Sequence, residues 1–204
     1  IAHKVYAFEP SPSTFNFLEN NIKQSKKRNI ELYNFGLGDS SFETTLSFPA
    51  CFSAGAFISS QCEKFSDYIN ENVRIQTIDA FVNDHQIDQI NLIKLDVEGF
   101  ETKVLAGAEK TLKTLKPVVI LEMNHFCLSV MQRICIPDFL DSLRNIFPIL
   151  LAYDEGSQTY NNLHNAKEAW HVMHEHVTKF KYVHLIGAFN ESQLKAFKEQ
   201  FQQQ

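Results

Sequence analysis

Carboxylates follow a short apolar run in the middle of the chain. Residues 91–97 are mostly apolar, and Asp96, Glu98 and Glu101 stand at and just beyond their end. So dense an apolar run is typical of a parallel strand that helices cover on both faces. Gly99 permits a tight turn, and an acid at position 101 suits a helix N-terminus. Because ligands of open α/β sheets bind beyond the carboxyl ends of the strands, Asp96 and Glu98 are candidates for catalysis or cofactor recognition. The residues alone leave open a second interpretation, in which these acids only cap the next helix.

Two further predicted strands end in acids. The β-prone residues 4–8 are followed by Glu9, and the apolar residues 118–121 are followed by Glu122 and, three residues later, His125. We expect both strands to run in the same direction as the one that ends at Asp96, because helical patterns separate them. Their acidic ends would then meet at one edge of a sheet.

The elements that carry these residues alternate between strands and helices. Besides those already given, we expect strands at 30–35, 73–78, 147–153 and 182–186, and helices around 15–22, 79–82, 104–115, 136–146, 166–177 and 194–201. Residues 40–74 are interpreted as an excursion over the surface that would suit a lid. Within it, 44–48 suggest an edge strand or hairpin, and 50–60 are aperiodic. This alternation predicts an α/β fold with a mostly parallel sheet and helices on both faces, in a single domain over 1–204.

Composition excludes several classes. The 204 residues carry a net charge of −5 with a pI near 5.9, which gives no basic footprint for nucleic acid. The cationic cluster 23–28 is interpreted as a solvated helix end. Since no apolar run approaches the roughly 20 residues that cross a bilayer, we expect a soluble, cytoplasmic protein without a membrane partner. The four cysteines lack CxxC spacing, which favours buried or inert thiols.

Several segments, in this order, resemble the FkbM family of S-adenosylmethionine-dependent methyltransferases. They include the motifs VYAFEPSP, IKLDVEGFE and LAGA, the last of which leads to Lys116 and Pro117. The runs NFGLGD at 34–39 and TID at 77–79 also resemble the family. The resemblance covers roughly residues 4–124, and the combination is more specific than any one segment.

The resemblance implies a Rossmann-like class I methyltransferase fold, a three-layer sandwich, with S-adenosyl-L-methionine as cofactor. Glu9, followed by Pro10, matches the acid that accepts hydrogen bonds from both ribose hydroxyls, a task suited to an ionised carboxylate. Residues 37–39 match the adenine site: Leu37 as an apolar wall, Gly38 beside it, and Asp39 as an acceptor for the amino group. The alternatives are a helix cap at Glu9 and an ordinary glycine-flanked turn at 37–39.

Asp96 matches the strand end beside the methionine part of the cofactor and the acceptor. The reaction implied is methylation of a hydroxyl on a small molecule or sugar, for which the protein must orient the acceptor and remove its proton. The available bases and orienters are Asp96, Glu98, Glu122 and His125. Related folds hold a divalent metal at these strand ends, an option that the sequence does not favour here.

One departure from the family stands out. The glycine-rich loop that follows the family's first strand has no counterpart in this sequence. We therefore expect an N-terminally incomplete domain that lacks the first strand and helix. Two alternatives therefore stay open: a degenerate, non-catalytic Rossmann-like binding domain, and a nucleotide-dependent oxidoreductase. The histidine-rich run 171–176 lacks HExxH spacing, which favours a solvated helix face over a metal site.

Overall fold

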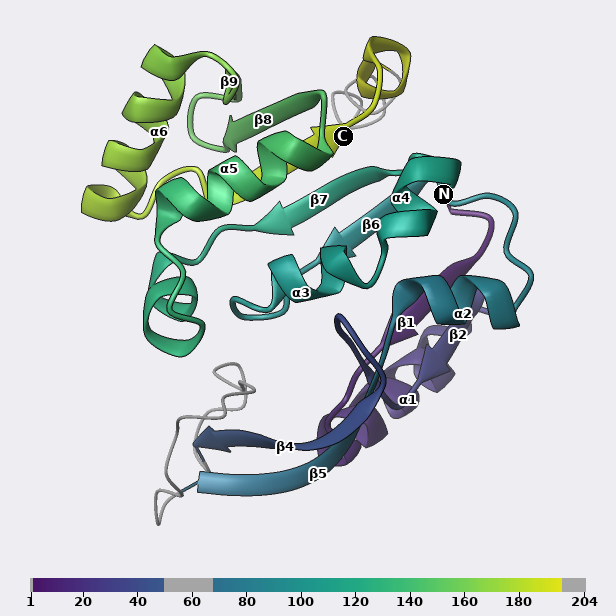
Figure 1. Cartoon of the computed structure of the whole chain (residues 1–204). Coiled ribbons are helices and arrows are strands. Elements are labelled where there is room, and N and C mark those ends of the chain that lie inside the picture. The colour runs from purple at the N-terminus through teal and green to yellow at the C-terminus, as the bar shows by residue number, and fades with distance from the viewer. Residues whose placement is uncertain (1, 50–67, 196–204) are drawn as a thin grey trace. The chain divides into compact units, whose positions relative to one another are not determined.

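The described residues, 2–49 and 68–195, form three sheets in this computed structural model (Figure 1). The chain divides into two compact units. Unit 1 comprises residues 1–85 and 103–108, and unit 2 comprises residues 86–102 and 109–204. The prediction of a single domain stays a prediction.

Unit 1 opens with a strand, a helix and a strand. Strand β1 (Val5–Phe8) pairs in parallel with β2 (Ile30–Tyr33), and helix α1 (Pro12–Ser25) connects them. The hydroxyl of Ser11 caps α1 by accepting a hydrogen bond from Thr14 N at 3.1 Å, and proline occupies the first helical position. These elements confirm the prediction for this segment.

Aromatic side chains pack β1 and β2 against helix α2 (Ile78–Asp84). The ring of Phe81 lies edge-on to Phe8 and Tyr33, with 4.8 Å between ring centroids in each case. Edge-on packing is a preferred geometry for aromatic pairs. Thr77, not Asp79, caps α2 through its hydroxyl, which accepts a hydrogen bond from Ala80 N at 3.0 Å. The helix expected around 79–82 is confirmed, and Asp79, an acid that could have capped it, lies in its first turn instead.

The second sheet of unit 1 contains β3 (Gly36–Leu37), β4 (Phe42–Pro49) and β5 (Tyr68–Gln76), in the order β3-β5-β4. β4 and β5 are antiparallel, which confirms the predicted edge strand or hairpin. The glycine-flanked run, for which an ordinary turn was the alternative interpretation, begins with β3, which pairs in parallel with β5. Of the excursion predicted at 40–74, the aperiodic part at 50–60 lies outside the described residues.

Unit 2 holds a five-stranded sheet in the order β6-β7-β10-β8-β9. Its strands are β6 (Leu92–Leu95), β7 (Val118–Glu122), β8 (Ile149–Asp154), β9 (Thr159–Asn162) and β10 (His184–Ala188). Only β6 and β7 pair in parallel among these neighbours; the other three pairings are antiparallel. The fold class α/β is confirmed, but the prediction of a mostly parallel sheet is wrong.

The unpredicted strand β9 explains the mixed sheet. β8 turns directly into β9, which reverses the chain, and helix α6 (Ala166–Lys179) then leads into β10. β10 therefore runs in the direction of β9 and enters antiparallel between β7 and β8. The four residues of β9 are mostly polar and give a weak apolar signal, yet this strand changes the direction of everything after it.

The helices of unit 2 complete its core. Helix α5 (Ile136–Ile146) lies against β8 (Figure 1). Its Phe139, Leu140 and Leu143 are completely buried. The π-helix η2 (Cys127–Met131) was not predicted. Residues 191–195 are helical, and the rest of the predicted terminal helix lies outside the described residues. In the described part of the chain, no helix is long and apolar enough to cross a membrane.

Two expectations about the central motif need correction. Leu92 at the start of β6 is 45% exposed, whereas Leu95 at its end is 3% exposed, so the strand is not covered on both faces along its length. Side chains alternate along a strand, and Leu92 and Lys94 share the face of β6 that is exposed, while Leu95 lies on the other face. The helix expected at 104–115 is two short helices, α3 (Glu101–Ala106) and α4 (Glu109–Leu115).

Candidate functional site

Glu9 lies in a tight turn directly after β1. Its amide N–H extends the pairing to Tyr33 O at 3.0 Å, and its Oε1 accepts a hydrogen bond from Ser11 N at 2.8 Å. The side-chain amide of Asn34 donates to the carbonyl of Glu9 at 2.9 Å. Burial and, to a smaller extent, the negative charge of Glu71 raise the pKa of Glu9, while the Ser11 N–H opposes the shift. The turn thus presents a half-buried carboxylate whose direction is fixed by both flanking strands.

The residues matched to the adenine site belong to the same unit. A Cβ at Gly36 would come within 3.2 Å of Pro10 Cβ, so the turn that contains Glu9 packs closely against the start of β3. Leu37 ends β3, and Gly38 N donates to Gln76 O at 3.0 Å. The exposed Asp39 lies 3.8 Å from the ammonium of Lys103.

Gly107 explains why the predicted long helix breaks. A Cβ at this position would lie 1.9 Å from Gly38 O, which no other residue type tolerates. Its carbonyl accepts a hydrogen bond from Asp79 N at 2.9 Å. The three segments of the family resemblance at 34–39, 77–79 and 105–108 therefore meet inside unit 1.

Asp96 and Glu122 form a carboxyl pair in unit 2. The register pairs Leu95 with Leu121, so the acids that follow them lie side by side at the carboxyl ends of β6 and β7. They share a hydrogen bond. Lys94 Nζ also contacts Asp96 Oδ2 at 2.8 Å, and His184 is the cross-strand neighbour of Glu122 on β10.

The Asp96 and Glu122 carboxyl groups share one proton, which resides mainly on Glu122. Burial raises the pKa of Glu122 to about 7, with further contributions from the hydrogen bond to Asp96 and from its charge. Burial opposes ionisation of Asp96 as well, but the hydrogen bond from Glu122 and the ion pair with Lys94 outweigh it and lower the pKa of Asp96. Two carboxylates in contact cannot both ionise easily. Asp96 is therefore the charged partner, and Glu122 exchanges its proton near neutral pH.

Glu98 and Glu101 support the turn after β6. Glu98 adopts a left-handed backbone with φ of 51°, and its Oε2 accepts hydrogen bonds from Asn124 Nδ2 at 3.3 Å and Cys127 Sγ at 3.1 Å. Glu101 is 1% exposed, and its Oε1 accepts from Val97 N at 3.2 Å. Burial raises the pKa of Glu101. Both acids thus accept hydrogen bonds that hold this turn in place, which makes them weaker candidates for proton transfer than Glu122.

His125 points to a different cluster. Its ring lies edge-on to His176 at 5.0 Å between centroids, and 5.6 Å from the ring of Phe180. Its Nδ1 is buried without a hydrogen-bond partner among the described residues. Of the four predicted bases and orienters, the structure brings Asp96 and Glu122 together, connects Glu98 to the loop after β7, and packs His125 against the end of α6.

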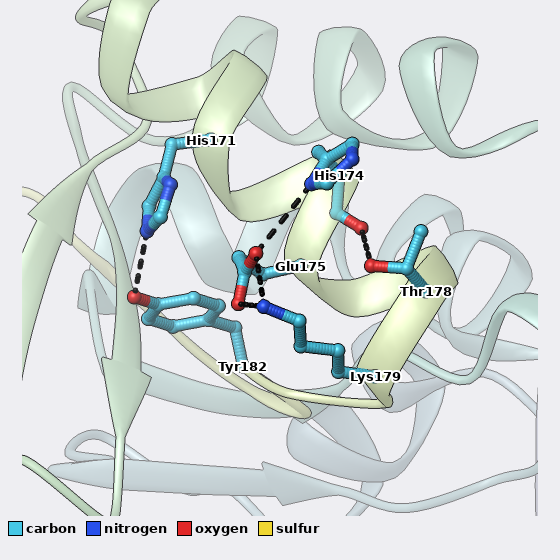
Figure 2. A network of polar contacts seen from close by, with 6 residues as sticks. All are labelled: His171, His174, Glu175, Thr178, Lys179 and Tyr182. Carbon is cyan, nitrogen blue, oxygen red and sulfur yellow. Dashed lines mark hydrogen bonds and ion pairs between the residues drawn. The ribbon is translucent and has the colours of Figure 1, made fainter.

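The histidine-rich run is only partly a solvated face. Figure 2 shows a polar network along α6, in which Lys179 Nζ contacts Glu175 Oε2 at 2.9 Å and Tyr182 OH lies 3.3 Å from His171 Nε2. His176, by contrast, is completely buried, and its Nδ1 lies 2.6 Å from Lys181 O. Burial lowers the pKa of His176. In the described part of the chain, no group of three or more His, Cys, Asp or Glu is placed to hold a metal ion.

Sequence reasoning missed four residues that shape these sites. They are Ser11 and Glu71 beside Glu9, and Lys94 and His184 beside the carboxyl pair. Lys94 stands two residues before Asp96, a spacing that places both side chains on one face of a strand and was available as a signal. Glu71 and His184 come from strands distant in sequence, and no local pattern indicates them.

The methyltransferase FkbM domain model matches residues 2–153 of the chain. The chain belongs to the FkbM methyltransferase family. The resemblance read from its motifs is thereby confirmed, and methyltransferases of this kind ordinarily use S-adenosylmethionine as methyl donor.

A curated relative and a solved structure are also similar to this FkbM-family chain. The relative is the hexuronic acid methyltransferase AglP of Haloferax volcanii, 28% identical over 116 residues, which are 57% of this chain and 46% of the relative. The chain therefore matches about half the length of that protein. The crystal structure of methyltransferase FkbM from Methylobacillus flagellatus KT matches 74% of this chain and 33% of its own, with 18% identity and a TM-score of 0.49.

Proposed function

We propose that this chain is an S-adenosylmethionine-dependent methyltransferase that methylates a hydroxyl of a small molecule or sugar. The observation that carries the proposal is the Asp96–Glu122 pair, a proton acceptor with a pKa near 7 at the strand ends of an FkbM-family chain. The name of the relative, a hexuronic acid methyltransferase, supports a carbohydrate acceptor. Family membership favours this function over the oxidoreductase alternative.

Glu9 is our candidate for holding the cofactor ribose. In the hydrogen bonds of the described residues, the Glu9 side chain accepts through Oε1 from Ser11 N. Its Oε2 can therefore accept from a ligand hydroxyl. An ionised carboxylate accepts strongly from hydroxyl donors, so the half-buried Glu9 fits this role. Pro10, Leu37, Gly38 and Asp39 are proposed to line the adenine side, as the family motif implies. When bound, S-adenosylmethionine supplies an electrophilic methyl group.

Glu122 is our candidate for the general base. Above a pH of about 7 it is ionised and can take the proton of an attacking hydroxyl. Asp96 holds Glu122 in place through their shared hydrogen bond, and Lys94 neutralises part of the charge of Asp96. We further propose the class I three-layer arrangement, and a cytoplasmic enzyme that needs neither metal nor nucleic acid nor membrane.

Calorimetry with S-adenosylhomocysteine tests the cofactor part of the proposal. We expect the purified chain to bind it and Glu9→Ala to weaken binding by about tenfold or more, since hydrogen bonds to a charged group are lost. Glu43→Gln, an exposed acid on β4, is the matched control and should bind as the wild type does. Binding that ignores Glu9→Ala would contradict the proposal.

Product formation tests the reaction. We expect S-adenosylhomocysteine to be released when a hexuronic acid or a neutral hexose is offered, and mass spectrometry to show a gain of one methyl group on the sugar. A chain that binds S-adenosylhomocysteine but methylates none of a broad panel of hydroxylated acceptors would instead be a non-catalytic binding domain.

A further inference from the structure

A second acid, Glu71, stands beside Glu9. It comes from β5, sixty residues further along the chain, and its Oε2 accepts a hydrogen bond from the Ser11 hydroxyl at 2.5 Å. The backbone N–H of the same serine donates to Glu9 Oε1 at 2.8 Å. Ser11 is only 2% exposed. One buried serine therefore bridges two carboxylates from different strands.

The hydroxyl of Ser11 has its orientation fixed from two sides. It accepts from Thr14 N at 3.1 Å as the cap of α1 and lies 3.1 Å from the Ser13 hydroxyl, which can donate to it while its own hydrogen points toward Glu71. Serine hydroxyls rotate to suit their partners, and a charged acceptor holds such a rotor strongly. Glu71 thus anchors to β5 the residue whose N–H aims the carboxylate of Glu9.

We propose that Glu71 is a positioning residue for Glu9 in cofactor recognition, acting through Ser11. The inference rests on the proposed function, in which Glu9 binds the ribose hydroxyls. Asn34 fixes the backbone of the same turn by donating to the carbonyls of Glu9 and Pro10 at 2.9 and 3.2 Å. Asn34 thus holds the backbone of the turn. Glu71 acts on the Glu9 side chain instead, because it holds Ser11, whose N–H donates to that side chain.

Burial raises the pKa of Glu9, and the charge of Glu71 adds a smaller contribution in the same direction. α1 has no acidic side chain in its first turn, Asn34 is neutral, and the charge that acts on Glu9 comes from Glu71. A neighbouring negative charge favours the protonated form of a carboxyl, so Glu9 loses its charge at a higher pH than it would alone. Removing that charge should let Glu9 stay ionised, and hold its ligand, to lower pH.

Two substitutions at position 71 separate anchoring from charge. Calorimetry with S-adenosylhomocysteine is run from pH 4.5 to 8 on the wild type, Glu71→Gln, Glu71→Ala and the control Glu43→Gln, each checked for folding by thermal melting. Glu71→Gln keeps an acceptor for Ser11, so we expect wild-type affinity at pH 8 and a loss of binding displaced to lower pH. Glu71→Ala removes the acceptor and should weaken binding about tenfold at pH 8. Glu43→Gln should follow the wild type throughout.

A titration without ligand gives an independent readout. The side-chain carboxyl carbon of Glu9, followed by NMR, should titrate at lower pH in Glu71→Gln than in the wild type. If Glu9→Ala loses binding while Glu71→Ala does not, and the titration of Glu9 is the same in every variant, the inference alone fails. If the wild type does not bind S-adenosylhomocysteine, or Glu9→Ala binds it equally well, the proposed function fails and the inference fails with it.

Discussion

The two units each hold a pair of acids, and the pairs are built differently. Between Glu9 and Glu71 stands a buried serine that donates to both. Asp96 and Glu122 are hydrogen-bonded to each other directly, and Asp96 also pairs with Lys94. A donor between two carboxylates lets both carry charge, whereas two carboxyls in contact must share a proton. The first arrangement suits binding of hydroxyl donors, and the second suits proton transfer.

The origin of the partners explains the difference. The register of β6 and β7 places Asp96 and Glu122 at adjacent strand ends with no residue between them. Glu71 lies instead on β5, which pairs with β3 and β4, and it meets Glu9 only through the cap of α1. The same residue type therefore acquires different chemistry from the elements that carry it.

Replacing the proposed base should have the largest effect. Glu122→Gln keeps a hydrogen-bond donor for Asp96 but cannot accept a proton, so we expect kcat to fall by about 10²- to 10⁴-fold. Wild-type activity should rise with pH through about 7, the pKa of Glu122, and the variant should lose this rise. Initial rates of S-adenosylhomocysteine formation from pH 5.5 to 9 measure both.

The same variant distinguishes the two pairs. Its affinity for S-adenosylhomocysteine should match that of the wild type, in contrast to Glu9→Ala. Glu109→Gln on the exposed face of α4 is the control for loss of an acid in unit 2. Wild-type turnover in Glu122→Gln would show that Glu122 is not the general base. The pair in unit 2 would then have no role in proton transfer.

Stability should change in the opposite direction to activity. The pKa of Glu122 is raised from 4.5 to about 7 in the folded chain, so its stabilising contribution is complete below pH 4.5 and is lost as pH rises through 7. Glutamine mimics the protonated form at every pH. We expect Glu122→Gln to equal the wild type near pH 4.5 and to exceed it by roughly 1–2 kcal/mol at pH 8.5, after allowance for solvent screening.

Urea unfolding at both pH values measures this difference. Glu109→Gln, which loses only an exposed ion pair, should show little change between them. A variant that is less stable than the wild type at pH 8.5 would mean that the ionised pair is favourable, contrary to the shared proton inferred from the geometry.

The sequence predicted the elements that carry the acids better than the contacts between them. Apolar runs ending at Glu9 and Glu122 indicated β1 and β7 correctly, because burial leaves a strong local pattern. The direction of β10 was wrong because it depends on β9, which has little apolar signal. Topology therefore depended on the weakest element of the chain.

The chemistry of the site needed three-dimensional contacts. The carboxyl groups of Asp96 and Glu122 could be named as candidates, but their shared proton follows from the register of two strands. Ser11 was expected only as part of a helix start, and its bond to Glu71 spans sixty residues. His176 was expected in solvent because its run of histidines is polar, yet the buried face of α6 includes it.

The smallest predicted effect concerns a thiol in unit 2. Cys127 donates to Glu98 at 3.1 Å, and burial, with this bond and nearby acidic charge, raises its pKa to about 12. Cys135 is exposed. Since only the thiolate reacts, iodoacetamide at pH 8 should label Cys135 before Cys127, as peptide mass spectrometry can show. Glu98→Gln removes a negative charge and should speed labelling of Cys127 while leaving Cys135 unchanged. Equal labelling of the two thiols in the wild type would contradict the pKa of Cys127 raised by burial and by the acids around it.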